Sequence, residues 1–506
     1  LAVAALTPGD PADADNPDLY IGDSEIQRAL ALWIDGAPVP GTQSTIGDAA
    51  MQGLLQIWVS GARVGPVGAP PTDPGQSQEA ELLRKLVPSL RDFTLVNLDP
   101  EKLLALARRG EAIQLPFSPA EAPGQVVSVG LKLQPAKLSD GEAEGALFRG
   151  AGRQTSVQKV RLEPTEYVGE VLGGGVAGFT LTRDGVLGAM WAPEGMVTGW
   201  AFVEPLGALL RENGASQSDI ARLTERFNHV AYNATGIDIR LKIDEDEPSA
   251  EVPEKPEPDG EAGALLDHVR SESEPAQPEW LWQVNETMNI YLFSDVEFYN
   301  VNPATVWTRQ RGVTLWVSVL FGLLEPGPFG NGEFDLPLNI VGQGTWVSGG
   351  PTSTDSATLL GQSYNMAPWG AIGINRNNVA FTHFFTGKNI DGTTIGRAWK
   401  IGGVDDTCGA SYSTSGPCQH SFSQPDFGGT TFYLKIILMA HEVGHVMGGL
   451  HGDFNPAYTA GSQTGPTIMR SSVTGSQVPY FSATNADTMG TFVYFECVAP
   501  IFGDQC

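Results

Sequence analysis

Residues 441–451 read HEVGHVMGGLH, and the run before them, 432–440, is mostly apolar. An apolar run of this length can carry a helix into the core of a domain. His441 and His445 lie four positions apart, on the same face of such a helix, so both imidazoles can reach one ion. The stretch therefore predicts a helix that ends in two metal ligands.

The other residues of this stretch complete a catalytic zinc site. Gly448 allows the sharp turn after which His451 can return as the third ligand. Three neutral imidazoles leave the fourth tetrahedral position for water, as in catalytic zinc sites. Glu442 lies beside the first ligand and can take a proton from that water. A two-histidine pattern also occurs on solvated helix faces, but Gly448 and His451 argue against chance. We expect one zinc ion, with His441 as its first ligand.

A second motif supports this prediction. Residues 466–471, PTIMRS, resemble the methionine turn of metzincins, in which the methionine (here Met469) lies beneath the zinc as an apolar floor. The chain from about Trp280 onward resembles reprolysin-like (adamalysin-like) metzincin zinc metallopeptidases. Ser471 stands where astacins and serralysins carry a tyrosine ligand, so a tyrosine-switched site is disfavoured. The family usually has Asp directly after the third histidine, whereas Gly452 intervenes here.

The resemblance implies a catalytic domain with a mixed twisted sheet and an active-site helix, which hydrolyses peptide bonds. Residues 377–399 look like the upper-rim strand of the family, with which a polypeptide substrate would pair as an added strand. The candidate substrate-binding residues are Thr394, Ile395, Gly396, Arg397 and Ala398.

The cysteines all fall in the last hundred residues: Cys408, Cys418, Cys497 and Cys506. No C-x-x-C spacing suggests a metal site, so disulfides in an oxidising compartment are favoured. Local pairing of 408 with 418 and 497 with 506 would close short loops. Resemblance to reprolysins suggests instead 408 with 497, which leaves 418 with 506. The apolar start, 1–6, fits the tail of a signal peptide or the start of a mature chain. We expect an extracellular or cell-surface protein.

An internal repeat lies near the start of the chain, where 21–39 recurs as 46–64. Each copy has apolar residues at helical spacing and a glycine stop, which predicts a helical hairpin over 1–64. It resembles the duplicated unit of dockerin-type modules, which implies a protein-interaction module. The calcium loops have decayed: the first keeps Asn16, Asp18 and Glu25, and the second only Asp48. Calcium is therefore weakly supported in the first copy and disfavoured in the second.

The whole chain is predicted to be an α+β multidomain protein. A Gly- and Pro-rich linker covers 65–78, and an acidic, Pro-rich linker covers 244–279. Between them, 79–243 is predicted to be a strand-rich α+β domain that resembles the propeptide region of bacterial metzincins, and 280–506 is the catalytic domain. Helices are expected at 79–90 and 100–109, and strands at 126–133, 157–162 and 179–182. The glycine-rich stretch 173–178 is expected to be a hairpin and not a phosphate loop.

The formal charge of −28 argues against nucleic acid and anionic membranes as partners. No stretch reaches the ~20 apolar residues of a membrane span, and 313–324 is predicted to be a buried helix. His229, His268, His383 and His420 are isolated and are expected in the core or on the surface.

These features together predict a secreted zinc endopeptidase, with the layout of a zymogen. The alternative is a surface-assembly or adhesion protein that keeps a metzincin domain for self-processing. No cysteine precedes Cys408, so a cysteine cannot block the zinc from the propeptide. The triplet Ile21-Gly22-Asp23 recurs at 46–48, which indicates a helix cap. Inhibition is therefore expected from 79–242 covering the cleft, with a carboxylate, a histidine such as His229 or backbone near the zinc.

Overall fold

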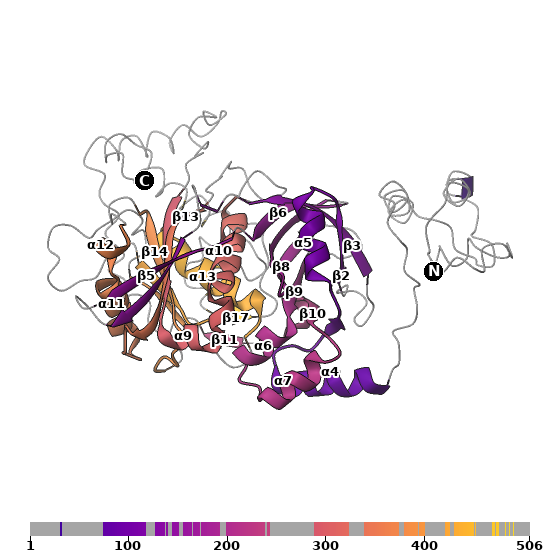
Figure 1. The fold of residues 1–506 in the computed structure, drawn as a ribbon, viewed down its shortest axis with the longest axis horizontal. Coiled ribbons are helices and arrows are strands. Elements are labelled where there is room, and N and C mark those ends of the chain that lie inside the picture. The colour runs from indigo at the N-terminus through magenta and orange to yellow at the C-terminus, as the bar shows by residue number, and fades with distance from the viewer. Residues whose placement is uncertain are drawn as a thin grey trace.

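The computed structural model of the chain is a mixed α+β structure built on two large sheets (Figure 1). The structure describes residues 31–32, 74–117, 127–136, 138–139, 144–150, 155–163, 165–172, 174–192, 199–237, 240–242, 288–322, 338–373, 379–392, 394–399, 420–425, 430–449, 451, 468–470, 472–474, 481, 485 and 489. Its α-helices include α4 (Pro74–Leu86), α5 (Pro100–Arg108), α6 (Leu206–Glu212), α7 (Gln217–Thr224), α9 (Val296–Val301), α10 (Val306–Gly322), α11 (Ser356–Met366), α12 (Trp369–Ile372) and α13 (Phe432–Val446).

The first sheet is antiparallel and has eight strands, in the order β1-β10-β9-β8-β7-β6-β3-β2. Both of its faces are buried. Ala201 and Val203 of β9 pack in a core that α5 closes, whereas Trp200 and Phe202 face the rest of the molecule, as the alternation of side chains along a strand requires. The strands are β1 (Phe93–Val96), β2 (Ile113–Phe117), β3 (Val127–Pro135), β6 (Glu166–Val171), β7 (Val176–Leu181), β8 (Val186–Ala192), β9 (Gly199–Pro205) and β10 (His229–Asn233).

The second sheet has seven strands, in the order β15-β16-β14-β12-β13-β4-β5. Its inner strands are parallel, and β15 and β5 run antiparallel at the two edges. Parallel strands need cover on both faces; α10 and α13 lie on one face, and α11 and α12 on the other. The strands are β4 (Glu144–Gly150), β5 (Ser156–Arg161), β12 (Met288–Ser294), β13 (Leu338–Gly349), β14 (Phe381–Phe385), β15 (Gly396–Ala398) and β16 (His420–Ser423).

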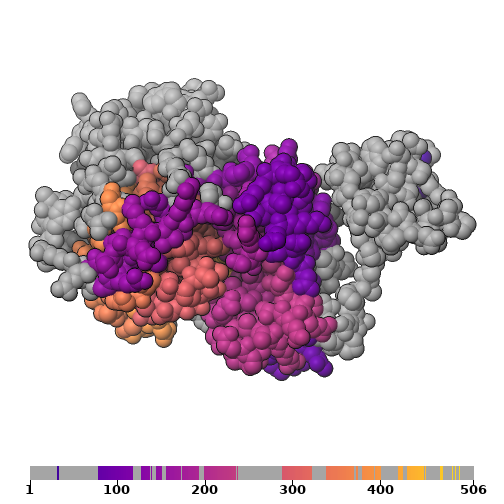
Figure 2. Space-filling model, viewed as in Figure 1, coloured from indigo at the N-terminus to yellow at the C-terminus, as the bar shows by residue number. Residues whose placement is uncertain are grey.

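The hairpin β4–β5 crosses the predicted domain boundary. It lies within the stretch 79–243, yet β4 pairs with β13 in the second sheet, and Phe148 packs edge-on against Trp346 with ring centroids 5.0 Å apart. Figure 2 shows the purple hairpin lying over the orange part of the molecule. The predicted division into 79–243 and 280–506 therefore does not separate the two sheets. The sequence pattern predicted a strand at 157–162, but alternation does not say with which sheet a strand pairs.

Helix α10 lies between the two sheets and joins their cores. The indole N–H of Trp316 donates to the Gly178 carbonyl of β7 at 2.8 Å. A Cβ on Gly178 would lie 3.1 Å from the Trp316 ring, so the glycine makes room for it. Arg311 donates to both carboxylate oxygens of Glu166 on β6, at 2.6 and 2.9 Å. The eight-stranded sheet and the seven-stranded sheet thus share one continuous core.

A two-stranded ribbon makes another link between the two regions. β11 (Arg240–Lys242) pairs antiparallel with β17 (Ser472–Thr474), which begins three positions after Met469. The end of the first predicted domain is therefore attached close to the predicted methionine turn.

Several elements expected from the sequence are present. α4 and α5 lie at the two predicted helices, β3, β5 and β7 at the predicted strands, and the stretch 313–322 is in the buried helix α10. The glycine-rich stretch is a β6–β7 hairpin, in which Gly174 and Gly175 have positive φ. No helix in the described ranges is long and apolar enough to cross a membrane. The helical hairpin 1–64 lies outside the described residues, apart from 31–32 in a helix.

Candidate metal centre

The candidate metal ligands lie at and just beyond the C-terminal end of α13. Every residue of this helix is buried, as the apolar run at its start requires. His441 and His445 lie in its last two turns, and the helix ends at Val446. Gly448 follows with φ of 99°, a left-handed conformation that favours glycine and turns the chain away from the helix axis. His451 lies three residues beyond this turn, beside the other two histidines.

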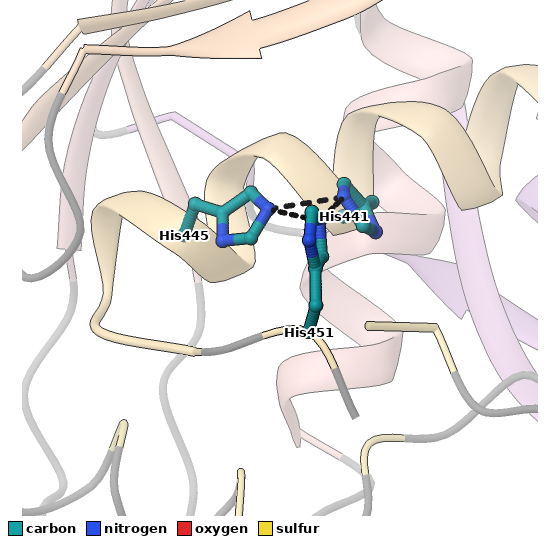
Figure 3. A group of neighbouring side chains, drawn as sticks. All are labelled: His441, His445 and His451. Atoms are coloured by element: carbon teal, nitrogen blue, oxygen red, sulfur yellow. Dashed lines mark hydrogen bonds between the residues drawn. The ribbon is translucent and has the colours of Figure 1, made fainter. Parts of the chain in front are cut away.

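The three imidazoles converge on one point (Figure 3). The Nε2 atoms of His441 and His445 are 3.0 Å apart, and the Nε2 atom of His451 lies 3.2 and 3.0 Å from them. All three rings are buried, with exposed fractions of 0%, 1% and 6%. Figure 3 shows two of them coming from the helix and the third from the chain that follows it.

The outer nitrogens of the helix histidines fix their protonation. Nδ1 of His441 lies 2.9 Å from the Ile468 carbonyl, and Nδ1 of His445 lies 2.8 Å from the Gly449 carbonyl. A carbonyl oxygen only accepts, so both Nδ1 atoms carry a proton and donate. In the neutral rings the inner Nε2 atoms are then unprotonated acceptors. Two such atoms cannot hydrogen-bond to each other, and their short separation is that of two ligands of one cation.

The electrostatics also favour neutral rings. Burial holds the pKa of His441 well below its usual value, and the neighbouring His445 and His451 lower it further. Burial and His451 lower the pKa of His445 to about 3. Neutral imidazole is the form that binds a metal. A tetrahedral zinc ion with bonds of ~2.0–2.1 Å would place neighbouring nitrogens about 3.3 Å apart. The observed separations of 3.0–3.2 Å fit that ion with small adjustments.

Glu442 follows His441 in α13, and its side chain lies close to the edge strand β15. Its side chain is completely buried. The backbone of Gly396 in β15 passes so close that a Cβ there would lie 2.3 Å from Glu442 Oε1 and 2.8 Å from its carboxyl carbon. Gly396 therefore allows the edge strand and the carboxylate to occupy adjacent positions, within reach of a peptide that pairs with the strand.

Met469, the residue of the predicted methionine turn, lies against α13 at Gly444. It is completely buried, and a Cβ on Gly444 would lie 2.5 Å from its sulfur. The same Cβ would lie 3.0 Å from the ring of Phe481, which stacks on Phe321 of α10 with centroids 5.1 Å apart. The absence of a side chain at Gly444 thus leaves room for Met469 and Phe481 against the helix. The Ile468 carbonyl that orients His441 belongs to this turn.

The edge strand has one free side among the residues that the structure describes. The Ile395 carbonyl accepts from the N–H of Gln424, the residue after β16, at 2.7 Å, and the Trp399 N–H donates to the His420 carbonyl of β16 at 2.8 Å. Backbone groups alternate sides along an antiparallel strand. The N–H and C=O groups of Gly396 and Ala398 therefore point away from β16, to the free side. Thr394 precedes the strand and is partly exposed.

Arg397 is the one charged residue of the predicted substrate-binding set. Its guanidinium donates to the Ser356 hydroxyl of α11 at 3.0 Å, so this side chain is tied to the scaffold beside the edge.

The other described histidines belong to the core, as expected. His383 bonds to Ser421 and Ser423, His420 bonds to Ser363 and Thr382, and both are completely buried. His229 accepts from the Val186 N–H at 2.9 Å within the eight-stranded sheet. Of the alternatives for a group near the zinc (a carboxylate, a histidine such as His229, or backbone), the histidine is not supported, because His229 lies in β10 and its ring joins that strand to the β7–β8 hairpin.

Some predicted residues lie outside the described ranges. They are the four cysteines, the candidate calcium ligands, His268, Gly452, Ser471 and the acidic linker 244–279. In contrast, the carbonyls of Ile468 and Gly449 were missed in the sequence although they orient the helix histidines. Backbone acceptors carry no residue-type signal, so histidine spacing alone could not identify them.

No known protein-family model matches the chain, and no curated protein matches it significantly. The function is therefore argued from the motif and from the geometry of the site.

Proposed function

We propose that the chain is a zinc-dependent endopeptidase of the metzincin type. The observation that carries the proposal is the convergence of three buried Nε2 atoms, with the Nδ1 atoms of His441 and His445 engaged by backbone carbonyls. Orienting bonds of this kind to the outer nitrogen are typical of metal-ligating histidines. His451 supplies the third nitrogen, and a three-histidine set leaves one zinc position open for catalysis.

Glu442 is the proposed general base and acid. When bound, zinc would supply a Lewis acid that polarises the scissile carbonyl and makes a water more acidic. The Glu442 carboxylate, one position after His441, can accept the proton of the attacking water and return it to the leaving amine. Its burial beneath β15 excludes bulk water, which strengthens its electrostatic effect on the reacting atoms.

The edge strand β15 gives the proposed substrate its orientation. A polypeptide in extended conformation can add to the free side of the strand, with hydrogen bonds to the backbone of Gly396 and Ala398. Such pairing depends on the backbone and not on side chains, so it suits a polypeptide substrate of varied sequence. The scissile bond would then lie above Glu442, because Gly396 contacts that side chain directly.

The test combines metal content with peptide hydrolysis on the full chain. We expect about one zinc per chain after dialysis and cleavage of unrelated unfolded polypeptides. Glu442→Gln should keep the zinc and lose nearly all hydrolysis, because the ligands remain while proton transfer is lost. His445→Ala should lose both. Zinc-free wild-type protein, or a Glu442→Gln variant that still cleaves at a comparable rate, would contradict the proposal. Cleavage of its own chain alone would favour the alternative of an assembly protein that processes itself.

A further inference from the structure

The N-terminal end of the active-site helix has no cap of its own. The first N–H groups of any helix lack partners within the helix, and a side chain at the N-cap usually binds one of them. In α13 the N-cap residue, Thr431, makes no side-chain capping bond. The first N–H, of Phe432, instead donates to Glu204 on β9 at 2.7 Å. The next, of Tyr433, donates to the Tyr232 hydroxyl on β10 at 3.4 Å.

The two capping groups form a unit inside the eight-stranded sheet. The Tyr232 hydroxyl donates to the same Glu204 oxygen that Phe432 uses. Both side chains are buried, with exposed fractions of 3% and 0%. Their strands, β9 and β10, are paired neighbours with Tyr232 opposite Phe202. One carboxyl oxygen of Glu204 thus accepts from both the Phe432 N–H and the Tyr232 hydroxyl.

Further contacts hold the first turn of α13 against the C-terminal end of α6. The Asn213 side chain donates to the Thr430 carbonyl at 3.0 Å. One turn into the helix, Lys435 donates to the Glu212 carboxylate at the end of α6, and Arg309 of α10 donates to that carboxylate at 3.4 Å. All three charged groups are buried, so each holds the others in place.

These contacts reach the zinc site through the helix itself. α13 runs without a break from Phe432 to Val446, so a shift or rotation at its start moves His441, Glu442 and His445 with it. The edge strand that faces Glu442 belongs to the other sheet. The helix thus packs on the sheet that contains this edge strand, while its first N–H groups are bound by the eight-stranded sheet.

We propose that Glu204 and Tyr232 are positioning residues that cap the active-site helix from the eight-stranded sheet and align its histidines and Glu442 with the edge strand. The inference rests on the proposed zinc peptidase function for its catalytic readout. If it is correct, the active enzyme keeps the region 79–243, because this region holds the active-site helix in place. The region would then not be a propeptide that is removed on activation.

The experiment uses the full chain with cobalt in place of zinc, because the visible spectrum of cobalt reports ligand geometry. Glu204→Ala should remain folded, show a changed cobalt spectrum and lose kcat by about 10- to 100-fold at nearly constant KM, as for a small misplacement of catalytic groups. Glu204→Gln keeps an acceptor for the Phe432 N–H, so it should restore the spectrum and most of kcat. Tyr232→Phe deletes a single hydroxyl and should act in the same direction, but more weakly.

Glu166→Ala is the matched control. It removes another buried carboxylate of the same sheet, but this one accepts from Arg311 of α10 and from Thr165, not from the first turn of α13. The control should leave the spectrum and kcat unchanged at equal folded fraction. An unchanged spectrum and kcat in Glu204→Ala, or equal changes in Glu166→Ala, would overturn the inference. If Glu204→Ala does not fold, Tyr232→Phe decides by the same criteria. If wild type binds cobalt but cleaves nothing, the proposed function fails, while the spectra still test the positioning.

Discussion

The two ends of α13 are held in different ways. At the C-terminal end, His441, His445 and His451 contact each other and the carbonyls of Ile468 and Gly449, all within a short stretch of the chain. At the N-terminal end, the partners lie more than 200 residues away in sequence, on β9, β10 and α6. The chemistry of the site is therefore encoded locally, and its placement depends on contacts between distant segments.

This difference changes the role expected for the region 79–243. A removable propeptide would cover the cleft and leave a complete enzyme behind. Here the region supplies β4 and β5 to the seven-stranded sheet, packs β7 against Trp316 and binds the start of α13. Removing it would expose large apolar side chains and leave Lys435 without its carboxylate partner. The comparison predicts that activity requires this region.

The largest effect should come from removing it. We expect the isolated segment 280–506 to aggregate or remain unfolded, with no measurable hydrolysis, because it lacks β4, β5 and the cap of α13. Latency through this region predicts the opposite, a rise in activity. Circular dichroism, size-exclusion chromatography and peptide hydrolysis of the segment and the full chain distinguish the two.

A cut in the linker provides the control for this truncation. A protease site inserted within 244–279 would break the chain without removing any strand. We expect the two pieces to co-purify and to keep the activity of the uncut chain. Separation of the pieces, with an active C-terminal fragment, would show that the region is a removable inhibitor.

A smaller but still large effect should follow Gly396→Ala. The added methyl group would lie 2.3 Å from Glu442 Oε1, so either the edge strand or the carboxylate must move. Zinc content should stay unchanged, while kcat/KM falls by about 10²-fold, the cost of a displacement near 1 Å. The matched control is Gly361→Ala on α11, where the nearest atom would be Trp399 at 3.8 Å. Equal activity of the Gly396 variant and the control would show that β15 and Glu442 are not tightly coupled.

The sequence predicted the local features well. The spacing of the three histidines, the glycine turn at Gly448 and the apolar run before His441 depend on helix periodicity, which is visible in a single stretch of chain. Gly396 was included in the edge strand for its resemblance to a family motif. Its contact with Glu442 came only from the fold.

The long-range features could not be predicted in the same way. Glu204 is one acidic residue among many in the chain, and nothing near it in sequence marks it as the cap of a helix more than 200 residues away. The partner of β4 was equally hidden, because a strand pattern specifies which faces are apolar but not the neighbouring strand. The sequence could therefore predict which histidines converge, but not the distant segments that hold their helix in place.

The smallest predicted effect is a pH dependence of stability that arises at the cap. Burial raises the pKa of Glu204 to about 7, although Lys435 and the bonds from Tyr232 and Phe432 lower it, and Glu212 raises it further. The pKa of an ordinary glutamate is 4.5, so the folded protein favours the protonated carboxyl. The protonation of Glu204 therefore stabilises the folded state. Its contribution to the free energy of unfolding is fully present below pH 4.5 and is lost as the pH rises through 7.

Comparison of the wild type with Glu204→Gln isolates this contribution. The free energy of unfolding of the wild type relative to the variant should fall by about 3 kcal/mol between pH 4.5 and 7, measured by urea denaturation at constant zinc. Buried histidines with lowered pKa values, such as His229, act in both proteins and cancel in the difference. Asp295, whose pKa burial raises to about 6, offers a second comparison. Asp295→Asn should remove a dependence that ends near pH 6, because the pKa of this carboxyl, which caps the start of α9, is raised to about 6. A flat difference between wild type and Glu204→Gln across this range would mean that Glu204 stays ionised, and that the cap is a permanent charge at the helix terminus.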